Sequence, residues 1–325
     1  LDLWGRVRRQ VEGAQARLTA AADDAESARL AVRAELATDY FSLRALDTEF
    51  ALLEQTVATY RRSLELTENR RAGGIATDLD VAQARTQLKS AEAELPAVEL
   101  QRAKLRHALA ALCGLPATGF SVLLTKEFSL AARAVPASLP SELLERRPDI
   151  AAAERRMAAA NADVGVAQAA FYPRVTLLGT AGLQSASLGT LVQWPSRLWA
   201  IGPSVDVPLF PLSRLKNLRA AAVANYDATV ATYRQTVLTA FQEVEDQLAA
   251  QRQLAAQIEL VQAALAAAQR TLEIANHRYQ AGLVTYLEVA AAQSAALTLE
   301  RRVVRLRAEA LVANVALVKA LGGDW

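Results

Sequence analysis

Hydrophobic residues recur along residues 36–64 at steps of three and four, which places them on one side of a helix. Their mean spacing is about 3.5 residues, the period of helices that coil around one another. The positions are Leu36, Tyr40, Leu43, Leu46, Phe50, Leu53, Val57, Tyr60 and Leu64. Because a helix with such an apolar stripe is unstable alone in water, we predict that it lies against neighbouring helices.

Glycine and proline interrupt the chain rarely, and the intervals between them predict helix lengths. Neither residue occurs between Gly13 and Gly73 or between Pro211 and Gly282, and Ala, Leu, Gln, Arg and Glu dominate both intervals. These residues are strong helix formers. We therefore predict two helices of roughly 60 or more residues, each about 90–100 Å long.

The second interval repeats the first at an offset of 208 residues, as from Gly74 to Gly282. The apolar stripe, several charged residues and the turn glycines all return at this offset without a gap. Matched pairs include Arg6 with Arg214, Glu35 with Glu243, Arg44 with Arg252, Thr77 with Thr285, Leu79 with Leu287 and Gly114 with Gly322. The chain is therefore predicted to be a tandem duplication. Each copy holds a long helix, a tight glycine turn and a shorter helix, at roughly 76–112 and 284–321.

A different pattern separates the two copies. Residues 148–170 predict a further helix that starts at Pro148 and covers part of the first long helix. Residues 171–210 then alternate between apolar and small or polar positions, which predicts two strands of roughly 10–14 residues in a hairpin. Such strands fit a transmembrane barrel, and an ordinary soluble hairpin fits them comparably well. Aromatic residues lie near the strand ends: Phe171, Tyr172, Trp194, Trp199 and Phe210.

These elements predict a mainly α-helical chain with a β-hairpin, organised in three parts. Residues 1–114 form the first repeat, a strand end followed by a helical hairpin. Residues 115–147 form a connector. Residues 148–322 form the second repeat, with a helix, the β-hairpin at 171–210 and a helical hairpin at 212–321. Two strands cannot close a barrel, so a chain that enters a membrane with them must oligomerise.

Composition and charge exclude several classes of function. Hydrophobic residues make up 52% of the chain but aromatics only 6%, as in closely packed helices. The net charge of +2 gives no electrostatic footprint for nucleic acid. Cys113 is the only cysteine, and His107 and His277 have no partner at metal-ligand spacing. No catalytic, phosphate-binding or zinc motif is present, so we expect no enzyme activity, cofactor or metal.

Several segments carry a resemblance to a known family. Residues 143–150, Leu-Leu-Glu-Arg-Arg-Pro-Asp-Ile, with Glu154 and residues 160–162, Ala-Asn-Ala, closely resemble a signature of outer-membrane efflux proteins. Residues 278–289 and 70–81 resemble the two helical tips of that family, and residues 207–210 and 1–8 resemble its strand exits. The chain is similar throughout to the NodT-type outer-membrane lipoproteins of tripartite, RND-type efflux systems, which are TolC-like.

The resemblance implies a homotrimer in the bacterial outer membrane that extends into the periplasm. Twelve strands would form a barrel continuous with a twelve-helix tunnel, serving an inner-membrane pump of the RND type and a periplasmic adaptor protein. Small molecules, drugs or metals, would pass through it passively toward the exterior. The family's signal peptide, lipid-bearing cysteine, first helices and first strand have no counterpart in this sequence, so we expect an N-terminally truncated chain.

The resemblance also assigns roles to residues at the helical tips. Small residues in the turns would let an adaptor approach: Gly73, Gly74, Ile75, Ala281, Gly282 and Leu283. Polar and aromatic residues beside the turns would form a periplasmic gate: Arg71, Asp78, Asp80, Arg278, Tyr279, Tyr286 and Glu288. Two positions depart from the family pattern, because Val284 and Ala291 stand where some members carry an arginine and an aspartate.

Two rival functions remain open at this point. The same architecture serves protein secretion through an ABC exporter, although the Arg-Arg-Pro-Asp signature favours small-molecule efflux. A soluble coiled-coil scaffold without a pore is the rival from another class. The 171–210 segment separates these readings, since a scaffold has no need of an alternating hairpin edged with aromatic residues.

Overall fold

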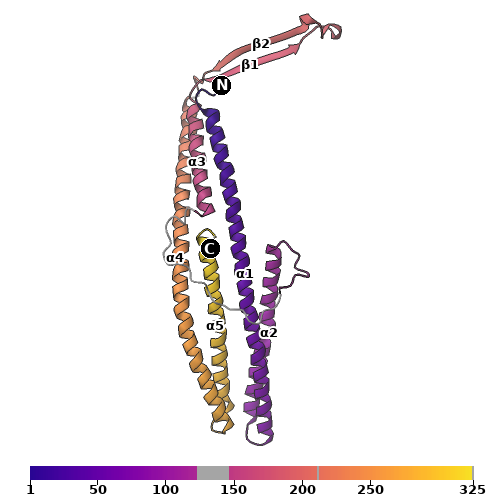
Figure 1. Ribbon diagram of the computed structural model, residues 1–325, viewed down its shortest axis with the longest axis vertical. Helices are drawn as coiled ribbons and strands as arrows, with labels where there is room; N and C mark the ends of the chain where they lie inside the picture. Colours follow the sequence, from indigo (N-terminus) through magenta and orange to yellow (C-terminus); the bar gives the residue numbers. More distant parts are fainter. Residues whose placement is uncertain (123–145, 211, 324–325) are drawn as a thin grey trace. The chain divides into compact units, whose positions relative to one another are not determined.

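The computed structural model describes residues 1–122, 146–210 and 212–323, and most of these residues are helical (Figure 1). Two short 3-10 turns, Leu188–Thr190 and Trp194–Ser196, lie between the strands. Most of the predicted connector, 115–147, lies outside the described residues. The helices and strands, in chain order, are α1 (Arg6–Ala72), α2 (Asp78–Leu112), α3 (Pro148–Ala169), β1 (Arg174–Leu183), β2 (Arg197–Asp206), α4 (Leu212–Gln280) and α5 (Tyr286–Ala320).

Contacts divide the chain into two compact units. Leu1–Ser27 and Ser141–Ala240 make up the first, which holds both strands and is named the strand unit here. Ala28–Pro140 and Phe241–Trp325 make up the second, named the helix unit.

The predicted long helices and the duplication are confirmed by the positions of the helix ends. α1 and α4 end at Ala72 and Gln280, and α2 and α5 begin at Asp78 and Tyr286, each pair at the offset of the repeat. Gly74 and Gly282 have φ angles of 72° and 74°, in the left-handed region that favours glycine. The same turn thus reverses the chain in both copies.

Gly13 lies inside a helix, because α1 already begins at Arg6. A Cβ atom at Gly13 would lie 3.5 Å from the Cβ of Ala162 and 3.6 Å from the carbonyl oxygen of Ala159. These are ordinary van der Waals distances, so α1 and α3 pack against each other here in the strand unit, and the space would also accept an alanine. Ion pairs Arg17–Asp163 and Arg156–Asp24 connect the same two helices further along α1.

The strands form an antiparallel pair that runs from Arg174 opposite Asp206 to Leu183 opposite Arg197. Val175, Leu177, Gly179 and Ala181 lie on one face, opposite Val205, Pro203, Ile201 and Trp199. The other face pairs Thr176 with Ser204, Leu178 with Gly202 and Thr180 with Ala200. One face is thus largely apolar, as predicted, and its larger side chains are exposed in the protomer.

The helix unit covers the predicted stripe of α1, burying some of its residues fully and others partly. Leu43, Leu53, Val57 and Tyr60 are all buried, and Val57 and Tyr60 pack with Leu88 and other residues of α2. Most other buried hydrophobic residues of this unit are alanines and valines, so the helices lie close together.

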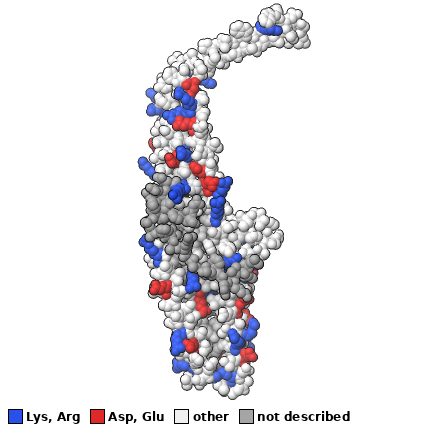
Figure 2. Space-filling view, in the orientation of Figure 1, with Lys and Arg blue, Asp and Glu red and all other residues white. Residues whose placement is uncertain are grey.

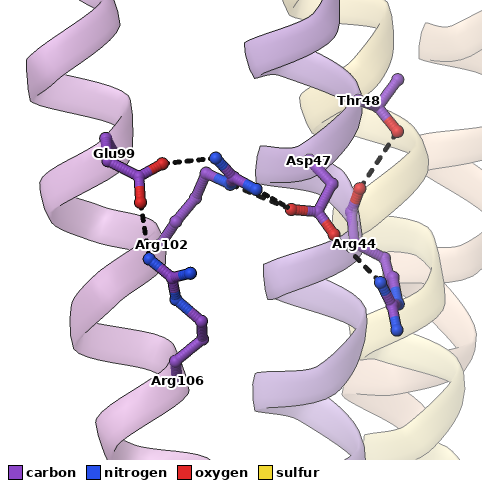
Figure 3. A network of polar contacts seen from close by, with 6 residues as sticks. All are labelled: Arg44, Asp47, Thr48, Glu99, Arg102 and Arg106. Carbon is purple, nitrogen blue, oxygen red and sulfur yellow. Dashed lines mark hydrogen bonds and ion pairs between the residues drawn. The ribbon is translucent and has the colours of Figure 1, made fainter. Parts of the chain in front are cut away.

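A buried ionic network joins α1 to α2 inside this helical core (Figure 3). Both Nε and Nη2 of Arg102 donate to Oδ1 of Asp47, at 2.9 and 2.8 Å. Nη1 of Arg44 donates to the other carboxylate oxygen at 3.0 Å. The side chains of these three residues are at most 5% exposed. Glu99 extends the network outward by accepting bonds from Arg102 and Arg106.

Candidate functional site: the paired helix turns

The turns between α1 and α2 and between α4 and α5 form one composite site at one end of the helix unit (Figure 1). Nη1 of Arg70 donates to the carbonyl oxygen of Gln280 at 3.1 Å, so the two turns are in direct contact. Their backbones match: the amides of Ile75 and Leu283 donate to the carbonyls of Arg70 and Arg278 at 2.8 and 2.9 Å. The repeat therefore produces two nearly identical turns side by side.

The outer surface of both turns is apolar. Ile75 and Leu283 are 68% and 71% exposed. Leu79 and Leu287, in the first turns of α2 and α5, are also exposed, so each turn presents two exposed aliphatic side chains. Gly73, Gly74, Ala281 and Gly282 lie exposed beside them. Exposed apolar groups gathered in this way are typical of a surface that contacts another protein.

Asp80 connects the N-termini of α2 and α5. Its Oδ2 accepts hydrogen bonds from the backbone amide and the hydroxyl of Thr77, at 2.9 and 2.7 Å, in a capping box at the start of α2. Its Oδ1 accepts a bond from the backbone amide of Tyr286 at 3.1 Å, at the first residue of α5. Thr285, the N-cap residue of α5, makes no side-chain cap bond of its own. One carboxylate thus caps two helices from different copies.

Electrostatics favours the charged form of Asp80. Burial opposes ionisation, but the hydrogen bonds from Thr77 and Tyr286 outweigh burial and hold the pKa of the Asp80 carboxyl below its ordinary value. The N-terminal ends of two helices also favour a negative charge at this place.

Tyr279 and Tyr286 fill the space between the two helical hairpins. Both are buried, with their rings 5.6 Å apart in an edge-to-face arrangement. The Tyr279 hydroxyl donates to the Thr67 hydroxyl at 3.3 Å, and the Arg70 guanidinium lies 4.9 Å above the Tyr279 ring. Both tyrosines therefore connect α4 and α5 to α1.

Tyr286 makes polar contacts with both copies. Its hydroxyl donates to Oε1 of Gln293 at 3.3 Å and lies 3.3 Å from the Ser63 hydroxyl. Burial raises the pKa of the Tyr286 hydroxyl, so this group stays protonated.

The remaining residues of the predicted gate are exposed. Nε of Arg71 lies 2.5 Å from Oδ1 of Asp78, and Nη1 of Arg278 lies 3.7 Å from Oε2 of Glu288. All four side chains are more than half exposed, so each pair contributes about 0–1 kcal/mol to stability. The predicted gate thus divides into a buried group of three residues and two exposed ion pairs.

Sequence analysis missed several residues that complete this site. Arg70, Thr67, Ser63 and Gln293 hold the two tyrosines through hydrogen bonds or ring contacts. A signal for Arg70 was available, because it matches Arg278 in the repeat. Nothing in the spacing pointed to the hydroxyl groups of Ser63 and Thr67, since serine and threonine on a long helix usually bond to its own backbone.

Two properties of the described residues concern membrane crossing and metal binding. None of the helices in residues 1–122, 146–210 and 212–323 combines the length and apolarity needed to cross a membrane. Within those same ranges, no three His, Cys, Asp or Glu residues gather as metal ligands.

The fold and the paired turns define a tandem helical-hairpin protein that carries an apolar antiparallel strand pair. Known proteins share this architecture over the whole chain. The profile described as outer membrane efflux protein matches residues 1–115 and 139–323. This chain therefore belongs to the outer membrane efflux protein family, with the TolC-like fold and a location in the bacterial outer membrane.

Individual relatives agree with this assignment. The probable efflux pump outer membrane protein TtgC of Pseudomonas putida is 36% identical over 332 residues, covering 100% of this chain and 67% of that protein. The outer membrane protein OprJ of Pseudomonas aeruginosa is 34% identical over 339 residues, covering 100% and 68%. The solved outer membrane protein VceC of Vibrio cholerae superposes with a TM-score of 0.91 at 34% identity, covering 99% of this chain and 77% of that one.

Proposed function

We propose that the protein is the outer-membrane channel of a tripartite efflux pump and conducts small molecules passively out of the cell. Three copies would contribute their strands to a closed barrel and their helical hairpins to a tunnel. The exposed apolar face of β1 and β2 carries this proposal, because this strand pair leaves unpaired edges that further strands must close in a membrane, as in a barrel. Energy would come from an inner-membrane pump, since the chain shows no nucleotide-binding motif.

Relatives narrow the class of substrate. Other relatives of this chain have names that specify antibiotic, toluene or solvent efflux. We infer that this chain conducts small apolar or amphipathic compounds of the same kind. The soluble scaffold receives no support from a hairpin whose largest side chains, Trp199 among them, are exposed to solvent in the protomer.

The apolar turn surface is proposed to contact the periplasmic adaptor. Ile75, Leu79, Leu283 and Leu287 form two equivalent apolar pairs, and two such pairs suit the tips of helical hairpins from a partner. The glycines at these turns let the partner's backbone come close, since no other described atom lies within 4 Å of a Cβ placed at Gly74 or Gly282.

The buried group is proposed to hold the channel closed. Asp80 joins α2 to α5, and Tyr279 and Tyr286 join the second hairpin to α1. Opening would separate the second hairpin from the first at this end, a shift between two packed arrangements of helices. The exposed pairs Arg71–Asp78 and Arg278–Glu288 would tune this equilibrium weakly.

Efflux from living cells tests the function. The full-length protein is expressed in a bacterium that lacks its own outer-membrane efflux channel, and loss of a preloaded fluorescent dye is followed. We expect the wild type to restore efflux and the double variant Ile75→Asp/Leu283→Asp to abolish it while still assembling in the membrane. Leu100→Asp places the same charge on an exposed leucine away from the turns and should leave efflux intact. Wild-type protein that assembles with its adaptor and pump yet never restores efflux would refute the proposal.

A further inference from the structure

We propose that basic side chains around the base of the β-hairpin bind the phosphate groups of anionic phospholipids in the periplasmic leaflet of the outer membrane. The inference rests on the proposed function, because it takes the hairpin as embedded in that membrane. The residues, named the basic belt here, are Arg6, Arg8, Arg9, Arg174, Arg214, Lys216 and Arg219.

The fold gathers the basic belt at one place in the strand unit. Arg174 is the first residue of β1, and Arg6 is the first residue of α1. Residues 1–5 are held at the base of the hairpin, because Nε1 of Trp4 donates to the carbonyl oxygen of Pro173 at 2.8 Å. α4 begins at Leu212, shortly after β2 ends at Asp206, and carries the other three basic residues in its first two turns.

Most residues of the basic belt form no ion pair with the residues that the structure describes. Arg8 pairs with Asp2 and Arg9 pairs with Glu12. The other five members are exposed and make no ion pair with any residue that the structure describes. They are Arg6, Arg174, Arg214, Lys216 and Arg219. Asp206 lies opposite Arg174 in the strand register but forms no ion pair with it. The seven basic residues of the belt thus outnumber the three acidic residues beside them, Asp2, Glu12 and Asp206, which leaves a local excess of positive charge.

The hairpin itself is almost uncharged, which separates the basic belt from the rest of the surface. Between Arg174 and Asp206 the sequence has one charged residue, Arg197, which lies at the far end of the hairpin. Figure 2 shows this contrast as a pale arm next to helices that carry blue and red side chains. The positive charge therefore lies where the apolar arm ends, as expected for headgroup contacts at one face of a bilayer.

A cavity at this junction has the chemistry of a lipid headgroup site. It measures about 490 Å³, and its lining includes Arg6 and Arg174, the carboxylates of Asp2 and Asp206, and the rings of Trp4 and Tyr172. Asp2 already pairs with Arg8. The two aromatic rings stack at 4.8 Å, and Nε1 of Trp4 donates to the carbonyl of Pro173 at 2.8 Å, which fixes the stack at the hairpin base. Tryptophan and tyrosine favour the boundary between headgroups and acyl chains.

The arginines would contact the phosphate group of a lipid molecule, and the strand pair would contact its acyl chains. A guanidinium group offers two parallel N–H donors to a phosphate. The exposed apolar face of the hairpin, with Val175, Leu177 and Val205 nearest its base, offers contact to the acyl chains. A free anion uses only the first of these contacts, so the arrangement favours a phospholipid over inorganic phosphate.

Lipid selectivity of the full-length protein tests the inference. Purified protein is incorporated into nanodiscs that contain phosphatidylglycerol and phosphatidylcholine in equal amounts, and the lipids retained after transfer to detergent are counted by native mass spectrometry. We expect the wild type to retain phosphatidylglycerol preferentially. The variant Arg6→Gln/Arg174→Gln/Arg214→Gln should lose roughly a hundredfold in this preference, because each basic residue near an anionic surface contributes about fivefold.

A matched control separates local binding from total charge. Lys104→Gln/Arg302→Gln/Arg307→Gln removes three exposed charges of the helix unit, none of which pairs with a described residue. We expect it to keep the lipid preference. An equal loss in both triple variants, or displacement of the lipid by inorganic phosphate alone, would overturn the inference.

Failure of the inference is distinguishable from failure of the proposed function. Wild-type protein that enters nanodiscs but retains both lipids equally contradicts only the basic belt. Wild-type protein that does not enter the nanodiscs at all contradicts the embedded hairpin, and with it the proposed function.

Discussion

Replacing Arg102 with alanine should destabilise the helix unit strongly, because it leaves Asp47 buried with one of its partners removed. The Arg102 guanidinium makes two bonds of 2.9 and 2.8 Å to Asp47, and both side chains are at most 5% exposed. Removing one partner of a buried ion pair costs about 3–5 kcal/mol, because the remaining charge stays buried away from water without the opposite charge that had stabilised it. The Arg102 guanidinium also lies 4.6 Å above the Phe50 ring, and that contact would be lost as well.

The repeat supplies the matched double variant. Ala255 and Ala310 stand in the second copy where Asp47 and Arg102 stand in the first. Asp47→Ala/Arg102→Ala therefore copies a solution that the chain already uses, and it removes both charges of the pair. We expect its cost to fall below the sum of the two single variants by roughly 1–3 kcal/mol, the coupling typical of residues in one network.

Urea unfolding followed by far-ultraviolet circular dichroism measures these free energies on the purified protein. Arg305→Ala is the control, because its side chain is 60% exposed and lies 3.6 Å from Glu49. Glu49 is buried but keeps its 2.6 Å ion pair with Arg301, so losing the exposed Arg305 should change the free energy of unfolding by about 0–1 kcal/mol. If Arg102→Ala costs no more than Arg305→Ala, or if the double variant costs the full sum, the buried network does not hold α2 against α1.

Three further perturbations address the paired turns. Gly74→Ala should lower the free energy of unfolding by about 1–2 kcal/mol because its φ of 72° disfavours an L side chain, whereas Gly73→Ala, which needs no positive φ, should be close to neutral. Calorimetry of the two variants checks this, and equal costs would contradict the backbone argument. Asp80 should make the protein less stable at low pH, because folding lowers the pKa of its carboxyl group. The contribution of Asp80 to the free energy of unfolding is complete above the unfolded pKa of about 3.9. It is lost as the pH falls through the lower folded pKa. Melting temperatures below pH ~4 should therefore drop more steeply for the wild type than for Asp80→Asn, and parallel curves would refute this. Tyr286→Phe removes a buried hydroxyl from Gln293 and Ser63 and should cost about 1–2 kcal/mol in thermal unfolding, whereas an unchanged stability would show that these bonds are not formed.

Much of the fold could be predicted because its determinants are local and repeated. The 3.5-residue stripe of α1 and the paired turn glycines predicted long helices and their ends to within a few residues. Gly13 shows the limit of this reasoning, since a glycine inside a helix leaves the same mark in the sequence as one that ends a helix. The alternation of residues 175–183 likewise predicted the strands, and the register with residues 197–205 came only from the structure.

The site was predictable in its location but not in its contacts. Asp80 could be placed beside a turn from its distance to Gly74, but its bond to Tyr286 joins residues 206 positions apart, which no local spacing reveals. The buried charges of Asp47 and Arg102 were missed because charged residues on a long helix are usually solvated. Comparing the copies could have exposed them, since alanines occupy the equivalent positions in the second repeat.

The roles given to the exposed tip residues remain predictions. Arg71, Asp78, Arg278 and Glu288 form two exposed ion pairs beside the turns, and their part in a gate is expected from the family resemblance. Measurements on the assembled channel address them.

Single-channel conductance of the reconstituted full-length protein tests the central claim most directly. The account predicts a low conductance for the wild type and a markedly higher one for Asp80→Ala, because this variant releases α5 from α2 at the turns. Leu100→Ala, an exposed position away from the turns, should conduct like the wild type. Membranes that stay non-conducting with both the wild type and Asp80→Ala, despite verified insertion, would contradict the account of this protein as a gated efflux channel.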